Sequence, residues 1–377
     1  MRQGMSKLFC TIMGLALVFL FSGCASNGDS PGQSLQGGAI QGDALSLSTA
    51  TSTFAGTVGI HPWPPVDGTG AAASFYEPYG ITTDGTNLYI AEKSSRYIRK
   101  IVISTKAVTT LVSVGFSEPT GITTDGTNLY VCDRSADSIQ KIKLSDNTMT
   151  RLAGGTSGTL DGTGVAAQFN EPYGITTDGT NLYVADRNNH TIRKIVISTG
   201  VVTTIAGQAG VPGFANGIGL AATFNQPMSI TTDGINLYVG DWNNFTIRKV
   251  VIATGAVSTL AGTVGVPGDD NGIGTAATFY GPRGITTDGT NLYVADMHGG
   301  QPHPTVVPGP PEFAGLIRKI NISTGAVTIV AGIPESSGSA DNPSGALATF
   351  NQPSGITTDG TSLFVTDREG HTIRQIQ

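Results

Sequence analysis

Short apolar stretches separated by glycine-containing turns repeat along residues 51–377. In the third copy the stretches are residues 174–177, 181–185, 191–197 and 201–206. Each is rich in Thr, Val, Ile or Tyr, which favour strands. Asp178-Gly179 and Thr199-Gly200 supply the positive φ that tight hairpins need. The pattern predicts four antiparallel strands in each unit, which we call strands a, b, c and d.

The unit occurs six times. The segment Gly-Ile-Thr-Thr-Asp-Gly-Thr-Asn-Leu-Tyr of residues 80–89 recurs in similar form, with its aspartate at Asp84, Asp125, Asp178, Asp233, Asp288 and Asp359. Successive aspartates are 41 to 71 residues apart, which is the length of a propeller blade plus variable loops. Apolar residues occupy both faces of strands b and c, as expected where each sheet is packed between two neighbours.

The two ends of the repeat region complement each other. The last unit stops at Ile376-Gln377, within strand c, and residues 51–59 resemble the strand d segment at residues 257–265. A strand supplied from the N-terminal side would complete the last blade and remove the exposed sheet edges. We therefore expect an all-β fold, a six-bladed β-propeller of four-stranded blades formed by residues 51–377.

The repeat resembles a known family. Residues 174–186 read Gly-Ile-Thr-Thr-Asp-Gly-Thr-Asn-Leu-Tyr-Val-Ala-Asp, and residues 188–194 read Asn-Asn-His-Thr-Ile-Arg-Lys; both are similar to the NHL repeat. The resemblance covers essentially residues 51–377 and implies a propeller. Members of that family serve as ligand- or partner-binding platforms, as RNA binders and occasionally as lyases. Because one fold hosts many activities, the resemblance does not by itself give the function.

Residues 1–50 follow a different pattern. A charged start with Arg2 and Lys7 precedes an apolar stretch that ends in Ser22-Gly23-Cys24. This arrangement resembles a bacterial lipoprotein signal, so we expect residues 1–23 to be removed and Cys24 to carry the lipid. An ordinary signal peptide or an uncleaved anchor are the alternatives. Residues 24–50, poor in apolar side chains, would form a flexible tether.

Net charge and the residue after Cys24 limit the classes of partner and the cellular location that we expect. The chain has a formal net charge of −6, a poor match for nucleic acid, whose binders cluster Lys and Arg. Ala25 follows the cysteine in place of a retention aspartate, which by resemblance to Gram-negative sorting favours the outer membrane. We expect a monomer that contacts the membrane through its lipid alone. Cys132, where other units have Ala or Gly, is interpreted as a small buried strand residue.

Two positions in each unit vary while their surroundings do not. One follows the acid that ends strand b and the other follows the proline that starts strand a, and both are expected near one mouth of the central channel. The cations and aromatic residues among them are the candidate ligand-binding residues: Tyr79, Lys93, Arg134, Tyr173, Arg187, Trp242, Arg283 and Arg368. Charge and stacking would suit an anionic or sugar-like ligand. Random variation of solvent-facing positions is the alternative.

Other chemically active residues point to structural roles. His190 and His371 share one turn position, which holds Arg96, Asp137 and Phe245 in other units, so a turn role is favoured over metal or acid–base chemistry. Aspartates in the d–a loops suit either turns or calcium: Asp67, Asp161, Asp269 and Asp270. We find no nucleophile elbow, phosphate loop or zinc signature. We therefore assign no catalytic residue, no metal ligand and no cofactor, although calcium remains an alternative.

The b–c and d–a connections should emerge together on one face, which we call the loop-rich face, where binding sites usually lie. Five equivalent phenylalanines in these connections are expected to be packing plugs: Phe75, Phe169, Phe224, Phe279 and Phe350. The fifth unit carries a proline-rich insertion at residues 297–315, suited to capping the channel or meeting a partner, and equally to a tolerated insertion.

The leading hypothesis is an envelope-anchored, non-catalytic platform that binds a ligand, a glycan, a peptide or a protein through the loop-rich face. The alternative is a metal-dependent propeller enzyme, a lyase or lactonase-like hydrolase, with its site in the central channel. That enzyme would need acids or histidines pointing into the channel from different strands. A surface scaffold without a small ligand is the third hypothesis.

Overall fold

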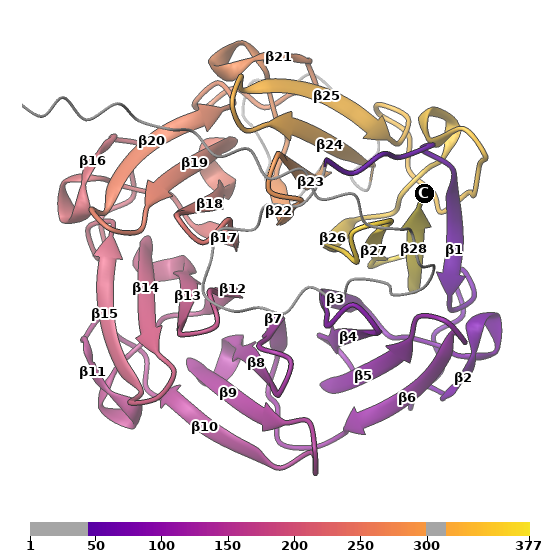
Figure 1. The fold of residues 1–377 in the computed structure, drawn as a ribbon, viewed down its shortest axis with the longest axis horizontal. Coiled ribbons are helices and arrows are strands. Elements are labelled where there is room, and N and C mark those ends of the chain that lie inside the picture. Colours follow the sequence, from indigo (N-terminus) through magenta and orange to yellow (C-terminus); the bar gives the residue numbers. More distant parts are fainter. Residues whose placement is uncertain (1–43, 299–313) are drawn as a thin grey trace, which may run out of the picture. The chain divides into compact units, whose positions relative to one another are not determined.

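The computed structural model describes residues 44–298 and 314–377, and these form six antiparallel sheets arranged as a ring around a central channel (Figure 1). The fold is the expected six-bladed β-propeller. Cys24, the predicted signal segment 1–23, the predicted tether up to residue 43 and most of the proline-rich insertion (299–313) lie outside the described residues. Within the described ranges, no helix is long and apolar enough to cross a membrane.

In each blade the four strands are ordered from strand a, next to the channel, to strand d at the outer edge of the ring. Blade 1 contains β3 (Pro78–Thr83), β4 (Asn87–Glu92), β5 (Tyr97–Val102) and β6 (Ala107–Val112). Blade 2 contains β7 (Pro119–Thr124), β8 (Asn128–Asp133), β9 (Ser138–Lys143) and β10 (Met149–Gly154). Blade 3 contains β12 (Pro172–Thr177), β13 (Asn181–Asp186), β14 (Thr191–Val196) and β15 (Val201–Ala206).

The second half of the ring follows the same order. Blade 4 contains β17 (Pro227–Thr232), β18 (Asn236–Asp241), β19 (Thr246–Val251) and β20 (Ala256–Ala261). Blade 5 contains β22 (Pro282–Thr287), β23 (Asn291–Met297), β24 (Gly315–Asn321) and β25 (Ala326–Ala331). Blade 6 contains β26 (Pro353–Thr358), β27 (Leu363–Asp367), β28 (Thr372–Ile376) and, as its outer strand, β1 (Thr51–Ala55).

Pairing of β1 with β28 closes the ring as predicted. The two strands are antiparallel, with Thr51 opposite Ile376 and Ser52 opposite Gln375. Residues just before β1 also contact the ring: the Leu45 amide donates to Asp288 Oδ2 at 2.9 Å, and the Gln377 amide donates to the Ala50 carbonyl at 3.0 Å. The folded part of the chain therefore begins before the first strand.

Four blades have a fifth strand that the sequence analysis did not predict. Each is a two-residue strand in the d–a connection that pairs with strand d of the next blade: β2 (Gly68–Thr69), β11 (Gly162–Thr163), β16 (Gly217–Ile218) and β21 (Gly272–Ile273). Short 3-10 turns follow them: η1 (Gly70–Ala72), η3 (Gly164–Ala166), η5 (Gly219–Ala221) and η7 (Gly274–Ala276). The connections thus fold back along the outer edge of the ring.

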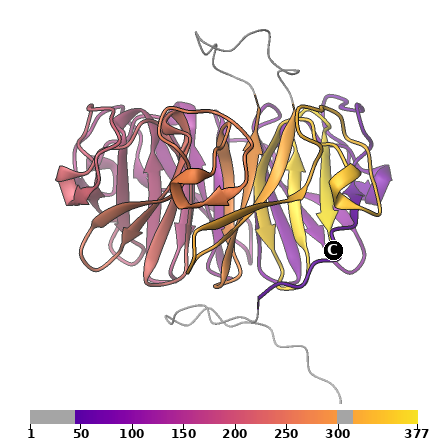
Figure 2. The same cartoon turned by 90° about the horizontal axis from the view of Figure 1, so that it is seen from above.

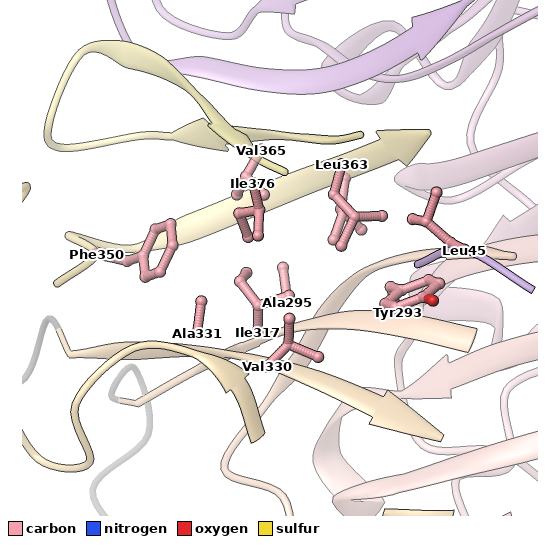
Figure 3. Close-up of a cluster of buried hydrophobic side chains, with 11 residues drawn as sticks. Leu45, Tyr293, Ala295, Ile317, Val330, Ala331, Phe350, Leu363, Val365 and Ile376 are labelled. Carbon is pink, nitrogen blue, oxygen red and sulfur yellow. The ribbon is translucent and has the colours of Figure 1, made fainter. Parts of the chain in front are cut away.

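The core lies between adjacent blades. Between blades 5 and 6, Tyr293 and Ile317 face Leu363 and Ile376, and Leu45 covers one end of this cluster with 7% of its surface exposed (Figure 3). The expected phenylalanine plugs are confirmed, since all five side chains are fully buried. Because each sheet is covered on both faces, apolar residues occur at successive positions of the inner strands.

A buried arginine in strand c holds each long d–a connection, a role that the sequence analysis missed. Arg193 Nη1 donates to Asp186 Oδ2 at 2.7 Å, and its Nη2 donates to Asp161 Oδ1 at 2.9 Å and to the Leu160 carbonyl at 3.0 Å. Its guanidinium lies 5.0 Å from the centre of the Phe169 ring. Equivalent arginines occupy four other blades: Arg99, Arg248, Arg318 and Arg374. Blade 2, which lacks the long connection, has Gln140 instead.

Candidate functional site

The two faces of the ring, seen edge-on in Figure 2, differ in how strictly they repeat. The a–b turns are nearly identical: in blade 3, Asp178 Oδ1 accepts the amides of Thr180 and Asn181, and Tyr183 donates its hydroxyl to Asp178 Oδ2. Blades 1, 2, 4 and 5 contain the same set of bonds. Departures from the repeat therefore gather on the loop-rich face, where the b–c and d–a connections lie.

The channel wall is formed by strand a of every blade. One residue per blade is an isoleucine, and these form a ring: Ile81, Ile122, Ile175, Ile230, Ile285 and Ile356. The preceding residue is Gly in five blades and Ser229 in blade 4. A Cβ atom at Gly80 would lie 2.0 Å from the Thr120 carbonyl oxygen, so the close approach of blades at the axis requires glycine there. Among the described channel-lining residues there is no carboxylate and no imidazole.

A cluster of four side chains, which we call the plug, lies at the loop-rich mouth of the channel. Tyr79, Tyr173, Met228 and Trp242 pack together, and each is at most 6% exposed. The Tyr173 hydroxyl donates to the Tyr79 hydroxyl at 2.5 Å, and the two rings cross at 78°. Burial raises the pKa of Tyr173 well above its ordinary value, and the neighbouring Tyr79 adds to this effect. Three of the predicted ligand-binding residues thus meet in a plug and are largely covered.

The predicted cations surround the plug in a mixed-charge network with glutamates. Lys93 and Arg134 both contact Glu118, at 3.0 and 2.9 Å. Arg134 and Arg187 share Glu171, at 2.8 and 2.6 Å. Arg368 Nη2 lies 3.1 Å from Glu77 Oε1. Four of the five predicted cations are therefore paired with glutamates, which reduces the excess of positive charge that the sequence suggested.

The sequence analysis missed the three glutamates, although a signal was present. Glu77, Glu118 and Glu171 each precede the strand-a proline, where the other blades have Gln or Gly. Burial acts to raise the pKa of Glu77 and Glu118, but hydrogen bonds from Ser94 and Ser135 together with the nearby cations outweigh it, and both pKa values lie below their ordinary range. Both side chains are therefore ionised at neutral pH.

Arg283 differs from the other predicted cations. It lines the channel mouth and makes no ion pair or hydrogen bond from its guanidinium with any of the described residues. Arg187, by contrast, belongs to the network, and its guanidinium lies 5.7 Å from the centres of both the Tyr173 and the Trp242 rings. All eight predicted residues thus lie in or around the mouth, with Arg283 as the cation that has not been neutralised.

The paired histidines have the structural role that was favoured. His190 and His371 have positive φ, 58° and 57°, and their Nδ1 atoms accept the amides of Gln226 at 3.0 Å and Glu77 at 3.2 Å. Burial lowers the pKa of both, that of His371 to about 4, where His61 adds to the effect. A histidine that accepts a hydrogen bond at Nδ1 must be unprotonated there, so the low pKa and the geometry agree.

The loop aspartates considered for calcium are partly engaged by protein groups. Asp67 contacts Arg99 at 2.8 Å and accepts the Thr110 amide, and Asp161 contacts Arg193. Within the part of the chain that the structure describes, no group of three or more His, Cys, Asp or Glu side chains has the arrangement of a metal site.

The chain is similar to two sets of known proteins, although no protein-family model matches it. It is 36% identical to human NHL repeat-containing protein 2 over 107 residues, which cover 27% of this chain and 15% of that protein. It is 35% identical to the chloroplastic protein SUPPRESSOR OF QUENCHING 1 of Arabidopsis thaliana over 107 residues, 10% of that protein. The repeats of this chain are thus similar to those of NHL repeat proteins over the aligned residues. The aligned region thus spans a small fraction of each relative, and their whole-protein activities do not follow from it.

Solved structures share the propeller fold of this chain. A protein of unknown function from Bacteroides thetaiotaomicron superimposes with a TM-score of 0.67 at 21% identity, covering 87% of this chain and 75% of that one. An auxiliary nutrient binding protein from the same species superimposes with a TM-score of 0.64 at 18% identity, covering 87% of this chain and 76% of that one. At these identities the likeness concerns the fold alone.

Proposed function

We propose that the protein is a non-catalytic binding platform, held at the bacterial outer membrane by a lipidated Cys24, that binds a polar ligand over the channel mouth. The observation that carries this proposal is the mixed-charge network around the Tyr79–Tyr173 plug. It combines half-buried donors and acceptors on a rigid ring, on the face where the six blades cease to repeat. Binding sites are commonly built from variable loops on such a scaffold.

The chemistry of the network suits a ligand with both donor and acceptor groups. Glu171 and Gln226 contact the guanidinium of Arg187, and Gln352 contacts that of Arg368 at 3.1 Å. A hydroxyl-rich or zwitterionic ligand can form hydrogen bonds with both members of such pairs, and Arg283 can form an ion pair with one carboxylate or phosphate. An auxiliary nutrient binding protein has the same fold, which is compatible with a binding role.

A thermal-shift screen of the full chain in detergent tests the proposal. The probes are neutral oligosaccharides, acidic sugars, cell-wall fragments and peptides, and a ligand that binds only the folded state raises the unfolding midpoint. The double variant Arg187→Ala plus Arg283→Ala should lose the shift given by a bound probe. If no probe moves the midpoint, the small-ligand platform is wrong and a protein scaffold takes its place.

The same screen, with divalent metals and EDTA, addresses the enzyme hypothesis. A metal-dependent shift that EDTA reverses would favour a lyase or hydrolase site. The described channel lining, formed largely by isoleucine and glycine, gives no specific observation in its favour.

The anchor is tested separately. Cys24→Ser should move the protein from the membrane fraction of a Gram-negative host to the soluble fraction, and metabolic labelling with an alkynyl fatty acid should fail. A Cys24→Ser chain that remains bound and unprocessed like the wild type would contradict lipidation.

A further inference from the structure

Five aromatic rings gather on the loop-rich face where blade 6 meets blade 1. His61 stacks on Tyr76 with ring centres 5.5 Å apart and planes at 15°, and also lies 4.2 Å from the His371 ring. Trp63 lies 6.1 Å from Tyr76 and 6.2 Å from Tyr97. We call these five residues the aromatic shelf. Its outermost member, Trp63, is 63% exposed.

The repeat provides an internal comparison, which shows that the fold does not require these rings. At the position of Tyr76, three other blades have Asn170, Asn225 and Asn351. At the position of Tyr97, four have Ser138, Thr191, Thr246 and Thr372. Blade 5 has Tyr280 and Leu316 at these positions, but the other blades form the same sheets with small polar residues there, so the fold itself does not require the two tyrosines of blade 1.

The loop that carries Trp63 is also unlike its counterparts. It is longer than the equivalent loops at residues 207–217 and 262–272, and Pro62, Pro64 and Pro65 surround the tryptophan. Proline fixes the backbone φ and lowers the freedom of the unbound loop. The backbone of a loop restricted in this way loses little conformational entropy when a ligand covers its indole.

Polar groups line the inner border of the shelf. The His371 ring accepts the Glu77 amide, and Arg368 contacts both Glu77 at 3.1 Å and Glu369 at 3.3 Å. The side chains of Arg368, Glu77 and Glu369 are between 17% and 33% exposed, whereas His371 is 6% exposed. The Tyr76 and Tyr97 hydroxyls make no hydrogen bond with the described part of the chain. Flat apolar faces therefore lie beside solvent-accessible hydroxyl, carboxylate and guanidinium groups.

We propose that the aromatic shelf is a carbohydrate-binding site in which Trp63 stacks on the apolar face of a pyranose ring of a neutral glycan, while Glu77 and Arg368 bind its hydroxyls. This inference rests on the proposed function and names its ligand class. A pyranose presents a C–H face and a rim of hydroxyls, which matches ring faces bordered by planar polar groups. The charges of Glu77 and Arg368 offset each other across 3.1 Å, which suits a neutral ligand.

The two tryptophans of the chain allow a direct test. Trp63 is exposed and Trp242 is 6% exposed, so iodide quenches the fluorescence of Trp63 selectively. The full chain in detergent is titrated with cello-, malto-, xylo-, manno- and chitohexaose and with a proline decapeptide. We expect at least one hexaose to protect Trp63 from iodide in a saturable manner.

Calorimetry with the protecting hexaose then locates the site. Trp63→Ala should weaken the affinity about tenfold or more, as truncation of a stacking anchor does, and Trp63→Phe should retain most of it. Phe214→Ala is the matched control: Phe214 is 61% exposed in the equivalent loop of blade 4 and has no aromatic partner among the described residues. Thermal unfolding should be the same for all variants because both side chains are exposed.

Three results would overturn the inference. The first is that no hexaose protects Trp63 from iodide. The second is that the proline decapeptide protects it while no sugar does, which would make the shelf a peptide site. The third is that Trp63→Ala binds the hexaose as tightly as the wild type. The last result would leave the proposed function intact and move the sugar to the channel mouth, where Arg187→Ala plus Arg283→Ala should abolish binding.

Discussion

Arg193 and Asp186 form an ion pair that water does not reach, with 2.7 Å between Nη1 and Oδ2 and at most 1% of either side chain exposed. The same arginine binds the carbonyl of Gln168 at 2.8 Å. One side chain thus joins the end of strand b to the connection that enters the blade. Burial raises the pKa of Asp186 to about 6, although Arg193 and the Asn170 amide act to lower it.

Arg193→Met should destabilise the domain by about 3–5 kcal/mol, because it leaves the Asp186 carboxylate buried without its cation. Urea unfolding measures the loss, and proteolysis should cut faster within residues 155–168. Gln140→Met is the control, since Gln140 fills the same position in the blade without a long connection and should cost far less. Equal losses for the two variants would contradict the role given to the arginine.

The His371 contact predicts a pH-dependent stability. The folded pKa of about 4 lies below the unfolded value of about 6.5, so the unfolded state binds more protons between these values. Stability due to this group is therefore present above pH ~6.5 and is lost as the pH falls toward ~4. The difference in unfolding free energy between wild type and His371→Gln should therefore shrink as the pH falls across that window. A difference that stays constant with pH would contradict the role given to His371.

Gly80→Ala should lower the thermal midpoint strongly. Its Cβ would meet the Thr120 carbonyl at 2.0 Å, and backbone on both sides must move, at a cost of about 1–3 kcal/mol or more. Ser229→Ala, at the same position in blade 4, carries a Cβ already and should be close to neutral. Calorimetric scans compare the two.

Ring closure is tested by deleting residues 51–59. The outer edge of blade 6 then loses its partner strand, and the single cooperative transition should be replaced by a broad one at lower temperature. Ser52→Ala, an exposed position in the same strand, should melt like the wild type. An unchanged unfolding transition after the deletion would show that the pairing of β1 with β28 is not needed for stability.

The strands, the six blades and the closure by β1 could be predicted because each repeats or completes a local pattern. The contact between the strand-c arginine and the d–a connection could not be derived from one repeat, because Arg193 binds groups 25 to 33 residues earlier in the chain. A signal was nevertheless present in the sequence, since blade 2 lacks both the arginine and the long connection. The position of Tyr79 near the mouth was predictable. That it reaches Tyr173 depends on the width of the channel, which follows from how six sheets pack.

Pairing of β1 with β28 has a consequence for how the chain is made. Synthesis proceeds from the N-terminal end, so the strand at residues 51–55 emerges long before its partner at residues 372–376. Contacts between such distant segments form slowly, and an unpaired strand is prone to associate with other chains meanwhile. The nascent protein must therefore shield this edge, by itself or with a chaperone, until the final blade has been delivered.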